Sequence, residues 1–516
     1  MLLSAVMTIF FIAICEHVCT SLRILMNTHN AAAAALERAN AVVIGSGPAG
    51  LATAIMLAKR GTTNIRLFDQ LPEPPSSTDE KWGRFDSARS YNIGLSGRGQ
   101  KVLKALGALP IIEQASSEMR LSLTWSPETP INSPSTRDLR RPLYQTICLE
   151  RDRLSACLVE EIRANYSDRI SLDFDTQCTH IAWKNFGSTD ESCIVQVKSK
   201  TSEGGSSVVA LETPFVVGAD GTNSVVRDMM SAQSSRLRLK TYVDTNTYVY
   251  RTIPLHPPHQ GDLGLGELFG NGSAYWDSGL TYSARSKVNI NIEALPTKEG
   301  VYLAVVLYRP QDPIMSALQT AQDAQDFFKT HFPMFIPFLK HENLLEFVSK
   351  GDSKFQRFQY CGPDLHCGRS ACLVGDSIHT VKPYFGLGVN SAFEDIAVLE
   401  ESLREHSNDL GSALKAYSIS RANEAKALVE VSQHFDKGLL QFLVPLIADR
   451  VLHKLLPSLF SPPLLTLMQD ERNGFVQVRR RKLRERLVLA TMTAGSMYGA
   501  ARLARGAFRV MLKALL

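Results

Sequence analysis

Three short motifs rich in glycine and aspartate are the parts of this 516-residue chain best suited to chemistry. In the first, the apolar run AVVI leads into Gly45-x-Gly47-x-x-Gly50 and then into a helical pattern. Gly45 allows a tight turn, Gly47 lets the backbone approach a diphosphate, and Gly50 lets the helix pack close to the strand. A second apolar run, IRLF, ends at Asp69, whose carboxylate is placed to accept hydrogen bonds from a ribose. This motif predicts a dinucleotide site.

The second motif is the stretch GDSIHTVKPYFGLGVNSAFED, which follows the apolar run ACLV. Gly375 and Asp376 end the predicted strand, where a carboxylate can hold the hydroxyls of a sugar-alcohol chain such as the ribityl chain of a flavin. Gly386 and Gly388 remove side chains where a flat ring must touch the backbone. The helix that follows presents free N–H groups, which favour negative charge on a reduced ring. With only one dinucleotide unit in the sequence, the two motifs together indicate one bound FAD.

The loop between these glycines is expected to complete the ring pocket. Pro383 stiffens it, and we expect Tyr384 and Phe385 to shape the pocket, although core packing would explain these two aromatic residues equally well. His379 is expected to be a structural hydrogen-bonding group rather than a base.

A third motif, FVVGADGTNSVVR, lies between the other two and contains Asp220 and Gly221. In this order, from about residue 40 to 405, the three motifs resemble those of the single-component FAD-dependent aromatic hydroxylases, whose fold is that of p-hydroxybenzoate hydroxylase. The resemblance implies that the third motif serves both FAD and the pyridine nucleotide, and that Arg151 approaches the flavin. The implied catalytic residues are Pro383, Tyr384, Phe385 and Gly386. The implied cofactor-binding residues are Gly45, Gly47, Gly50, Asp69, Arg89, Arg151, Asp220, Gly221, Gly375, Asp376, Gly386, Gly388, Val389 and Asn390.

Within that family, RSYNIGLSGRGQKVLKALG and PYFGLGVNSAFED are similar to segments of the kynurenine 3-monooxygenases. That branch holds the substrate carboxylate with an arginine two positions after a Met-Arg pair; here the pair is Met119-Arg120 and the position holds Ser122. A neutral serine cannot replace a bidentate guanidinium. Either Arg120 turns inward and takes this role, or the pocket binds a ring that has no amino-acid tail. A late substrate-side tyrosine of the branch matches Phe475 here.

The resemblance implies an activity. A nicotinamide donor, NADPH or NADH, reduces FAD, O2 forms a flavin hydroperoxide, and an electron-rich phenol or aniline is hydroxylated. The sequence has no HExxH motif or Cys/His cluster that would predict a metal site, and no feature of the body predicts a nucleic-acid partner. Two other classes stay open: a membrane-associated FAD-dependent reductase or dehydrogenase, and a non-catalytic FAD-binding protein.

The elements that must position these residues are of two kinds. Apolar runs such as AVVIGSG, FVVGAD and ACLVGD predict buried parallel strands, whereas VNINIEAL and VYLAVVLY predict a sheet with one exposed face. We therefore expect an α/β protein with a Rossmann-like FAD-binding domain, interleaved with a mostly antiparallel β-sheet substrate domain and followed by C-terminal helices. The expected boundaries are 1–39 for an apolar segment and linker, 40–235 and 351–405 for the FAD-binding domain with an insertion near 110–145, 236–350 for the substrate sheet, 406–470 for helices and 471–516 for a tail.

Both ends of the chain differ in composition from its middle. Residues 1–15 are apolar and uncharged, which predicts a targeting or anchor segment, unless they belong to a disordered extension from a mis-assigned start. Residues 472–513 contain eleven Lys or Arg and one Glu, a net charge of +10, which leaves the rest of a +5 chain near −5. This composition predicts a helix at a membrane surface, the alternative being an amphipathic helix docked on the body.

Location is inferred from the tail and from the cysteines. The resemblance to the kynurenine branch implies attachment of the tail to the mitochondrial outer membrane or to another organelle membrane. Nine scattered cysteines without a CxxC pair argue against a disulfide framework and for a reducing compartment.

Overall fold

The computed structural model describes residues 36–82, 91–141, 143–200, 205–244, 247–257, 279–383, 386–435 and 439–515. The predictions made for residues 1–15, Arg89, Tyr384 and Phe385 lie outside these ranges.

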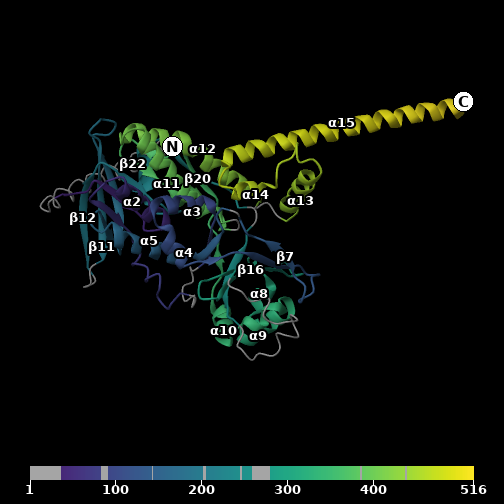
Figure 1. Ribbon diagram of the computed structural model, residues 1–516, viewed down its shortest axis with the longest axis horizontal. Helices are drawn as coiled ribbons and strands as arrows, with labels where there is room; N and C mark the ends of the chain where they lie inside the picture. The colour runs from purple at the N-terminus through teal and green to yellow at the C-terminus, as the bar shows by residue number, and fades with distance from the viewer. Residues whose placement is uncertain are drawn as a thin grey trace, which may run out of the picture.

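A six-stranded sheet forms the centre of the larger part of the molecule (Figure 1). Its strands are parallel except for the edge pair β21–β22. Three of the four inner strands are fully buried, as the apolar runs AVVI, VVG and ACL require of strands covered on both faces. In spatial order the strands are β21 (His366–Cys367), β22 (Ala371–Leu373), β13 (Val216–Gly218), β2 (Ala41–Ile44), β3 (Ile65–Phe68) and β9 (Ile170–Asp173).

Helices pack around this sheet and against one another. The helix of the first motif, α2, contacts α5, α3 and α11, and α11 contacts α12. Ten of the twelve residues of α2 are buried, which explains why its sequence is rich in alanine and leucine. These helices are α2 (Pro48–Lys59), α3 (Gly97–Leu106), α4 (Leu109–Gln114), α5 (Arg151–Asn165), α6 (Val225–Gln233), α11 (Leu387–Glu405) and α12 (Leu410–Phe435).

Three smaller sheets surround the central one. A four-stranded sheet has the order β1 (Glu37–Arg38), β12 (Ser206–Thr213), β11 (Ser192–Lys200) and β10 (Thr176–Lys184). A three-stranded sheet has the order β4 (Asn92–Leu95), β8 (Ile147–Glu150) and β5 (Ser117–Glu118). Another consists of β14 (Leu237–Thr241), β20 (Gln359–Pro363) and β23 (His379–Thr380).

A seven-stranded sheet builds the second part, at the bottom of Figure 1. It is antiparallel except for the parallel pair β6–β16. Its order is β19 (Ser353–Lys354), β15 (Val249–Leu255), β18 (Tyr302–Tyr308), β17 (Asn291–Pro296), β16 (Leu280–Arg285), β6 (Leu121–Trp125) and β7 (Ser135–Asp138). One face packs into a separate core with α8 (Pro313–Ala317), α9 (Ala321–His331), the 3₁₀ helix η1 (Pro333–Phe338) and α10 (His341–Ser349).

The C-terminal part is helical. It contains α13 (Leu439–Leu455), α14 (Leu464–Gln469) and the 41-residue α15 (Phe475–Leu515), which projects from the body in Figure 1. Among the described residues, no helix combines the length with the apolar character that crossing a bilayer requires. The seven cysteines in the described ranges are free and buried. The predicted mixture of a parallel α/β unit, a mostly antiparallel sheet and C-terminal helices is confirmed.

Candidate active site

The three sequence motifs meet at one edge of the six-stranded sheet. They follow β2, β13 and β22, which are adjacent and parallel, so their carboxyl ends open at the same edge. Gly45 has φ +107°, and a Cβ built there would lie 2.4 Å from the carbonyl oxygen of Ala219. The backbone N–H of Val374 donates to the carbonyl oxygen of Gly218 over 3.0 Å. Segments more than 150 residues apart in the sequence are therefore in direct contact.

The first motif leaves the amino end of α2 open. Gly47 is the N-cap residue and no side chain caps the helix, so its first N–H groups remain available to a ligand. Gly50 packs against the turn, because a Cβ there would lie 1.9 Å from the carbonyl oxygen of Gly45. The nearest atom to a Cβ at Gly47 is Nη2 of Arg151, 3.9 Å away. A guanidinium thus lies beside the glycine turn, where a diphosphate would carry negative charge.

Asp69 and Asp220 hold loops in place through their carboxylates. Asp69 accepts hydrogen bonds from the N–H (2.5 Å) and Oγ (2.8 Å) of Ser46 and from the N–H of Leu71 (2.8 Å). Asp220 accepts from Ser224 Oγ (2.5 Å) and from the first N–H groups of α6, including that of Val225 (2.7 Å). Both aspartates therefore already have protein partners in the glycine and DG loops.

Asp376 has a different environment. Its carboxylate accepts no hydrogen bond from the described residues and is accessible, yet desolvation raises its pKa, against the lowering effect of His379 and Arg151. Desolvation likewise raises the pKa of Tyr91 to about 12, near Arg151 and Asp376. Burial acts to lower the pKa of Arg151, but the negative groups around it, among them Asp376 and Asp69, hold it above its usual value. Because Asp376 is accessible to solvent and yet desolvated by surrounding protein atoms, we infer that these side chains face a hollow.

This hollow fits FAD. It combines an uncapped helix amino end, glycines whose Cβ atoms would collide with backbone, a guanidinium and a carboxylate without a hydrogen-bond partner among the described residues. The sequence motifs did not single out Tyr91, although it lies in the segment RSYNIGLSGRG.

A buried ionic network fixes the Gly375–Asp376 turn from behind. Asp395 of α11 accepts hydrogen bonds from the N–H of Gly375 (2.8 Å) and from Nε of Arg421 (2.5 Å), and its Oδ2 lies 2.8 Å from His379 Nε2. His379 and Asp395 are fully buried and Arg421 is nearly so. Burial would raise the pKa of Asp395, but the charges of His379 and Arg421 outweigh it and lower that pKa. His379 thus has the hydrogen-bonding position expected for a structural group.

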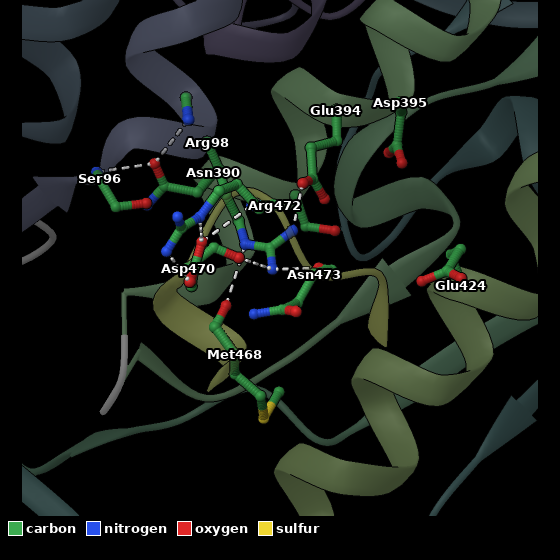
Figure 2. A network of polar contacts seen from close by, with 12 residues as sticks. Ser96, Arg98, Asn390, Glu394, Asp395, Glu424, Met468, Asp470, Arg472 and Asn473 are labelled. Carbon is green, nitrogen blue, oxygen red and sulfur yellow. Dashed lines mark hydrogen bonds and ion pairs between the residues drawn. The ribbon is translucent and has the colours of Figure 1, made fainter. Parts of the chain in front are cut away.

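Asn390 connects the loop before α11 to the start of α3 (Figure 2). Its amide nitrogen donates to the carbonyl oxygens of Gly386 (2.5 Å) and Gly94 (2.9 Å), and its oxygen accepts from the N–H of Ser96 (3.0 Å) and Gly99 (3.2 Å). Every polar atom of its side chain is therefore used inside the protein. Gly386 itself, with φ +62°, is the N-cap of α11, while Gly388 and Val389 lie in the first turn of that helix.

The seven-stranded sheet approaches this hollow at the end of β17. Asn92 of β4 donates to the carbonyl oxygens of Leu295 (3.1 Å) and Pro296 (3.2 Å). On β6 and β16, Leu123, Trp125, Tyr282 and Ala284 belong to the core shared with the helices. Because side chains alternate along a strand, Ser122 and Ser283 lie on the opposite face.

That opposite face is polar. Ser283 is the cross-strand partner of Glu293 and donates to its carboxylate over 2.8 Å. Desolvation raises the pKa of Glu293 to about 7, although the residue is accessible, so this carboxylate also faces a hollow rather than open solvent. Ser122 is the cross-strand partner of Arg137 on β7. The sequence analysis identified neither Glu293 nor Arg137; the alternating pattern of VNINIEAL was the available signal for Glu293.

The residues compared with the substrate site of the kynurenine branch are Arg120, Ser122 and Phe475. Arg120 immediately precedes β6 and lies over Gly279, where a Cβ would come within 2.2 Å of its Nε. Ser122 is half-buried within β6. Phe475 is 1% exposed in a core with α12 and α14, and the guanidinium of Arg98 lies 4.5 Å above its ring.

Comparison with known proteins agrees with this geometry. Residues 288–432 match the family model of an FAD binding domain. The chain is 27% identical over 435 residues to a kynurenine 3-monooxygenase of Salinispora arenicola, with 83% of this chain and 87% of that protein covered. It is 24% identical over 441 residues to a kynurenine 3-monooxygenase of Sus scrofa, with 83% of each chain covered.

Solved structures share the fold. 2-Methyl-3-hydroxypyridine-5-carboxylic acid oxygenase matches with a TM-score of 0.56 and 21% identity, covering 81% of this chain and 93% of that one. PqsL of P. aeruginosa, in complex with 2-aminobenzoylacetate, matches with a TM-score of 0.56 and 16% identity, covering 79% and 98%. The chain is therefore similar in sequence to an FAD binding domain and to kynurenine 3-monooxygenases, and it shares the fold of these solved oxygenases.

Proposed function

We propose that this protein hydroxylates an electron-rich aromatic amine or phenol of the kynurenine type, with NADPH or NADH as the reductant and O2 as the oxygen source. The supporting observation is the hollow formed by the three motif loops, next to the polar face of the seven-stranded sheet. FAD, when bound, supplies the electron transfer and the activation of oxygen. The protein supplies binding, orientation and exclusion of water.

The proposed cofactor contacts divide into two groups. The amino end of α2, with Gly45, Gly47 and Arg151, holds the diphosphate, and Asp376 accepts hydrogen bonds from the sugar-alcohol hydroxyls. The second group holds the surrounding loops rather than FAD itself, because its polar groups already form hydrogen bonds or turns within the protein. It consists of Asp69, Asp220, Gly221 and Asn390. The amino end of α11 is proposed to lie beside the flavin ring, where the partial positive charge of the helix end favours the reduced flavin. The residues that place this helix end are Pro383, Gly386, Gly388 and Val389. Residues 40–235 and 351–405 are proposed as the cofactor unit and 236–350 as the body of the substrate sheet.

The substrate's acidic group is assigned to Arg137. Cross-strand partners lie on the same face of a sheet, so Arg137 presents a guanidinium beside Ser122. Arg137 is exposed on β7, and among the described residues no carboxylate pairs with it; desolvation by nearby protein atoms, together with the charges of Arg141 and Arg450, lowers its pKa. A cation in such a position attracts a carboxylate. This supports a substrate that carries an acidic tail, with Arg137 rather than Ser122 as the binding group.

The test is turnover by the purified, FAD-loaded protein. NADPH, NADH and O2 consumption would be measured with kynurenine, anthranilate and simple phenols, and products would be identified by mass spectrometry. Hydroxylated product formed in step with O2 consumption supports the proposal. Oxidation of NAD(P)H with an acceptor other than O2 would support a reductase, and absence of any turnover with bound FAD would support a non-catalytic flavoprotein.

Arginine variants test the substrate assignment. In Arg137→Ala the KM for a carboxylate-bearing substrate should rise about tenfold to a hundredfold, since a charge-assisted hydrogen bond contributes ~1.5–3 kcal/mol. Arg140→Ala is the matched control, because Arg140 lies three residues away, is exposed and pairs with Asp138. An equal loss in Arg120→Ala and none in Arg137→Ala would assign the role to Arg120 instead.

We further propose that α15 attaches the protein to a membrane surface, at the mitochondrial outer membrane or another organelle membrane. Its net positive charge and its exposed apolar residues support an interfacial position. Fractionation of cells that express the intact chain, followed by salt and carbonate washes of the membranes, tests this location.

A further inference from the structure

The root of α15 encloses a hollow that the proposed hydroxylase does not use. Its volume is about 800 Å³, within the ~300–1,000 Å³ range of small-molecule sites. Its walls are the loop 457–462, Glu424 of α12 and one side of the first turns of α15. Arg480, Arg481 and Arg484 line it from α15. Arg484 lies one turn after Arg480 and Arg481, at the i+4 and i+3 spacings that make residues neighbours on a helix surface.

The charge inside this hollow is positive and uncompensated. Glu424 accepts a hydrogen bond from the N–H of Val476 (3.1 Å), so the amino end of α15 already neutralises part of its charge. Glu485 is bound by Lys482 Nζ (2.9 Å) and by the N–H of Ser461 (2.9 Å). Among the described residues, no carboxylate forms an ion pair with the three lining arginines. Arg479, in contrast, pairs with Glu430 at 2.7 Å.

Exposed apolar side chains lie on α15 and on α13, whose Asp449 forms an ion pair with Lys482 of α15 at 3.0 Å. On α13, Val444, Ile447, Val451 and Leu455 recur at helical spacing and are each 48–69% exposed. On α15, Leu487 is 67% exposed, and beyond it nearly all described side chains up to Arg509 are exposed. This helix extends away from the body in Figure 1. Large apolar residues next to a cationic hollow are typical of a surface that faces lipid.

We propose that this hollow binds the phosphate of an anionic phospholipid headgroup, while the exposed apolar residues of α13 and α15 enter the boundary between headgroups and acyl chains. The inference rests on the proposed membrane attachment and adds a defined lipid site to it. A second copy of the chain is a poor occupant, because two surfaces with the net +10 of residues 472–513 repel each other. An anionic bilayer supplies the complementary charge.

The test compares two triple variants of the full-length, FAD-loaded protein. Arg480→Gln/Arg481→Gln/Arg484→Gln removes the charges that line the hollow. Arg502→Gln/Arg505→Gln/Arg509→Gln removes the same number of charges from the same helix outside it. Binding to phosphatidylcholine vesicles with and without phosphatidylserine would be measured by co-sedimentation. We expect the first variant to bind phosphatidylserine vesicles at least about tenfold more weakly than the second.

Other outcomes overturn the proposal in distinguishable ways. Equal losses in the two variants would show that general charge attraction, not the hollow, binds the lipid. Saturable binding of inorganic phosphate that phosphatidylserine vesicles do not displace would assign the hollow to a free phosphate compound. Failure of the unaltered protein to bind either vesicle would refute the membrane attachment as well. The flavin absorbance and turnover of each variant report separately on the hydroxylase and on folding.

Discussion

At the scale of single residues, the free carboxylate of Asp376 separates it from the other aspartates of the motifs. Asp69 and Asp220 are saturated by Ser46 and by the start of α6, whereas Asp376 faces the hollow without a hydrogen-bond donor among the described residues. A carboxylate in a desolvated position gains most from a ligand that donates hydrogen bonds. Cofactor affinity should therefore depend on Asp376 more strongly than on exposed acidic residues.

Asp376→Ala should weaken FAD binding about tenfold to a hundredfold, because the variant loses a charge-assisted hydrogen bond that contributes ~1.5–3 kcal/mol. The measurement is fluorescence titration of the apoprotein with FAD. Asp168→Ala is the matched control, since that side chain is 73% exposed and far along the chain from the motifs. The same Kd for the two variants would contradict the assignment of the hollow.

Glu293 should make the stability of the ligand-free protein depend on pH. Desolvation raises its pKa from 4.5 to about 7, so the folded protein binds its proton more tightly than the unfolded chain does. The free energy of unfolding therefore falls as pH rises from about 4.5 through 7. Glu293→Gln should remove this pH-dependent loss of stability. The Tm of the variant minus that of the unaltered protein should therefore increase as the pH is raised from 5 to 8.

Ser283→Ala is the companion variant for Glu293. The hydrogen bond from Ser283 lowers the pKa of Glu293, so its removal should shift the transition to higher pH. The measurement is Tm by differential scanning fluorimetry across this range. Identical pH profiles in all three proteins would show that Glu293 is solvated in the folded state.

At the scale of elements, α12 supports the cofactor loop from outside the sheet. Arg421 reaches from α12 to Asp395 of α11 (2.5 Å) and to the carbonyl oxygen of Ser391 (2.9 Å). Asp395 in turn holds the N–H of Gly375 at 2.8 Å. The positions of α11 and of the Gly375–Asp376 turn are therefore coupled through one buried carboxylate.

Arg421→Leu should lower the free energy of unfolding by roughly 3–5 kcal/mol, because it leaves a buried carboxylate without its principal cation. Arg404→Leu on α11 is the control, since Arg404 is 60% exposed and pairs only with neighbours on its own helix. Urea denaturation and FAD content measure the two effects. A stability loss equal to that of the control would show that His379 alone compensates Asp395.

At the scale of the whole molecule, α15 has two parts with different surroundings. Phe475 and Val478 are buried against α12 and α14. Arg98 fastens this root by donating to the carbonyl oxygens of Met468 (2.9 Å), Asp470 (2.7 Å) and Asn473 (2.6 Å), as Figure 2 shows. Beyond about Val488 the described side chains are exposed. The basic tail is thus rooted in the body before it projects.

Two truncations should separate these parts. Removal of residues 489–516 should leave FAD content and Tm unchanged and should weaken membrane binding without abolishing it, because the arginines at the root of α15 remain. Removal of residues 472–516 also deletes Phe475 and should lower the free energy of unfolding by at least ~3 kcal/mol, the loss expected for a buried phenylalanine. Thermal unfolding and membrane fractionation of both proteins provide the measurement. Membrane binding that persists unchanged after removal of residues 472–516 would place the attachment elsewhere in the chain.

The sequence by itself determined the parallel sheet, the glycine turns and the cofactor class. These properties are local, because a buried strand followed by glycines and a helix predicts a dinucleotide-binding turn wherever it occurs in a chain. The positions of Gly45, Gly375 and Asp376 followed from their own neighbours in sequence. The mixed fold also followed, because apolar runs and alternating segments differ in their hydrophobic period.

The tertiary structure alone decided which residues face the two hollows. Arg137 and Ser122 are brought together by strand register, as are Ser283 and Glu293. The arginines at the root of α15 line one hollow because the loop 457–462 lies beside them. Such contacts join segments distant in sequence, and the local pattern of a strand or helix carries no information about the element packed against it.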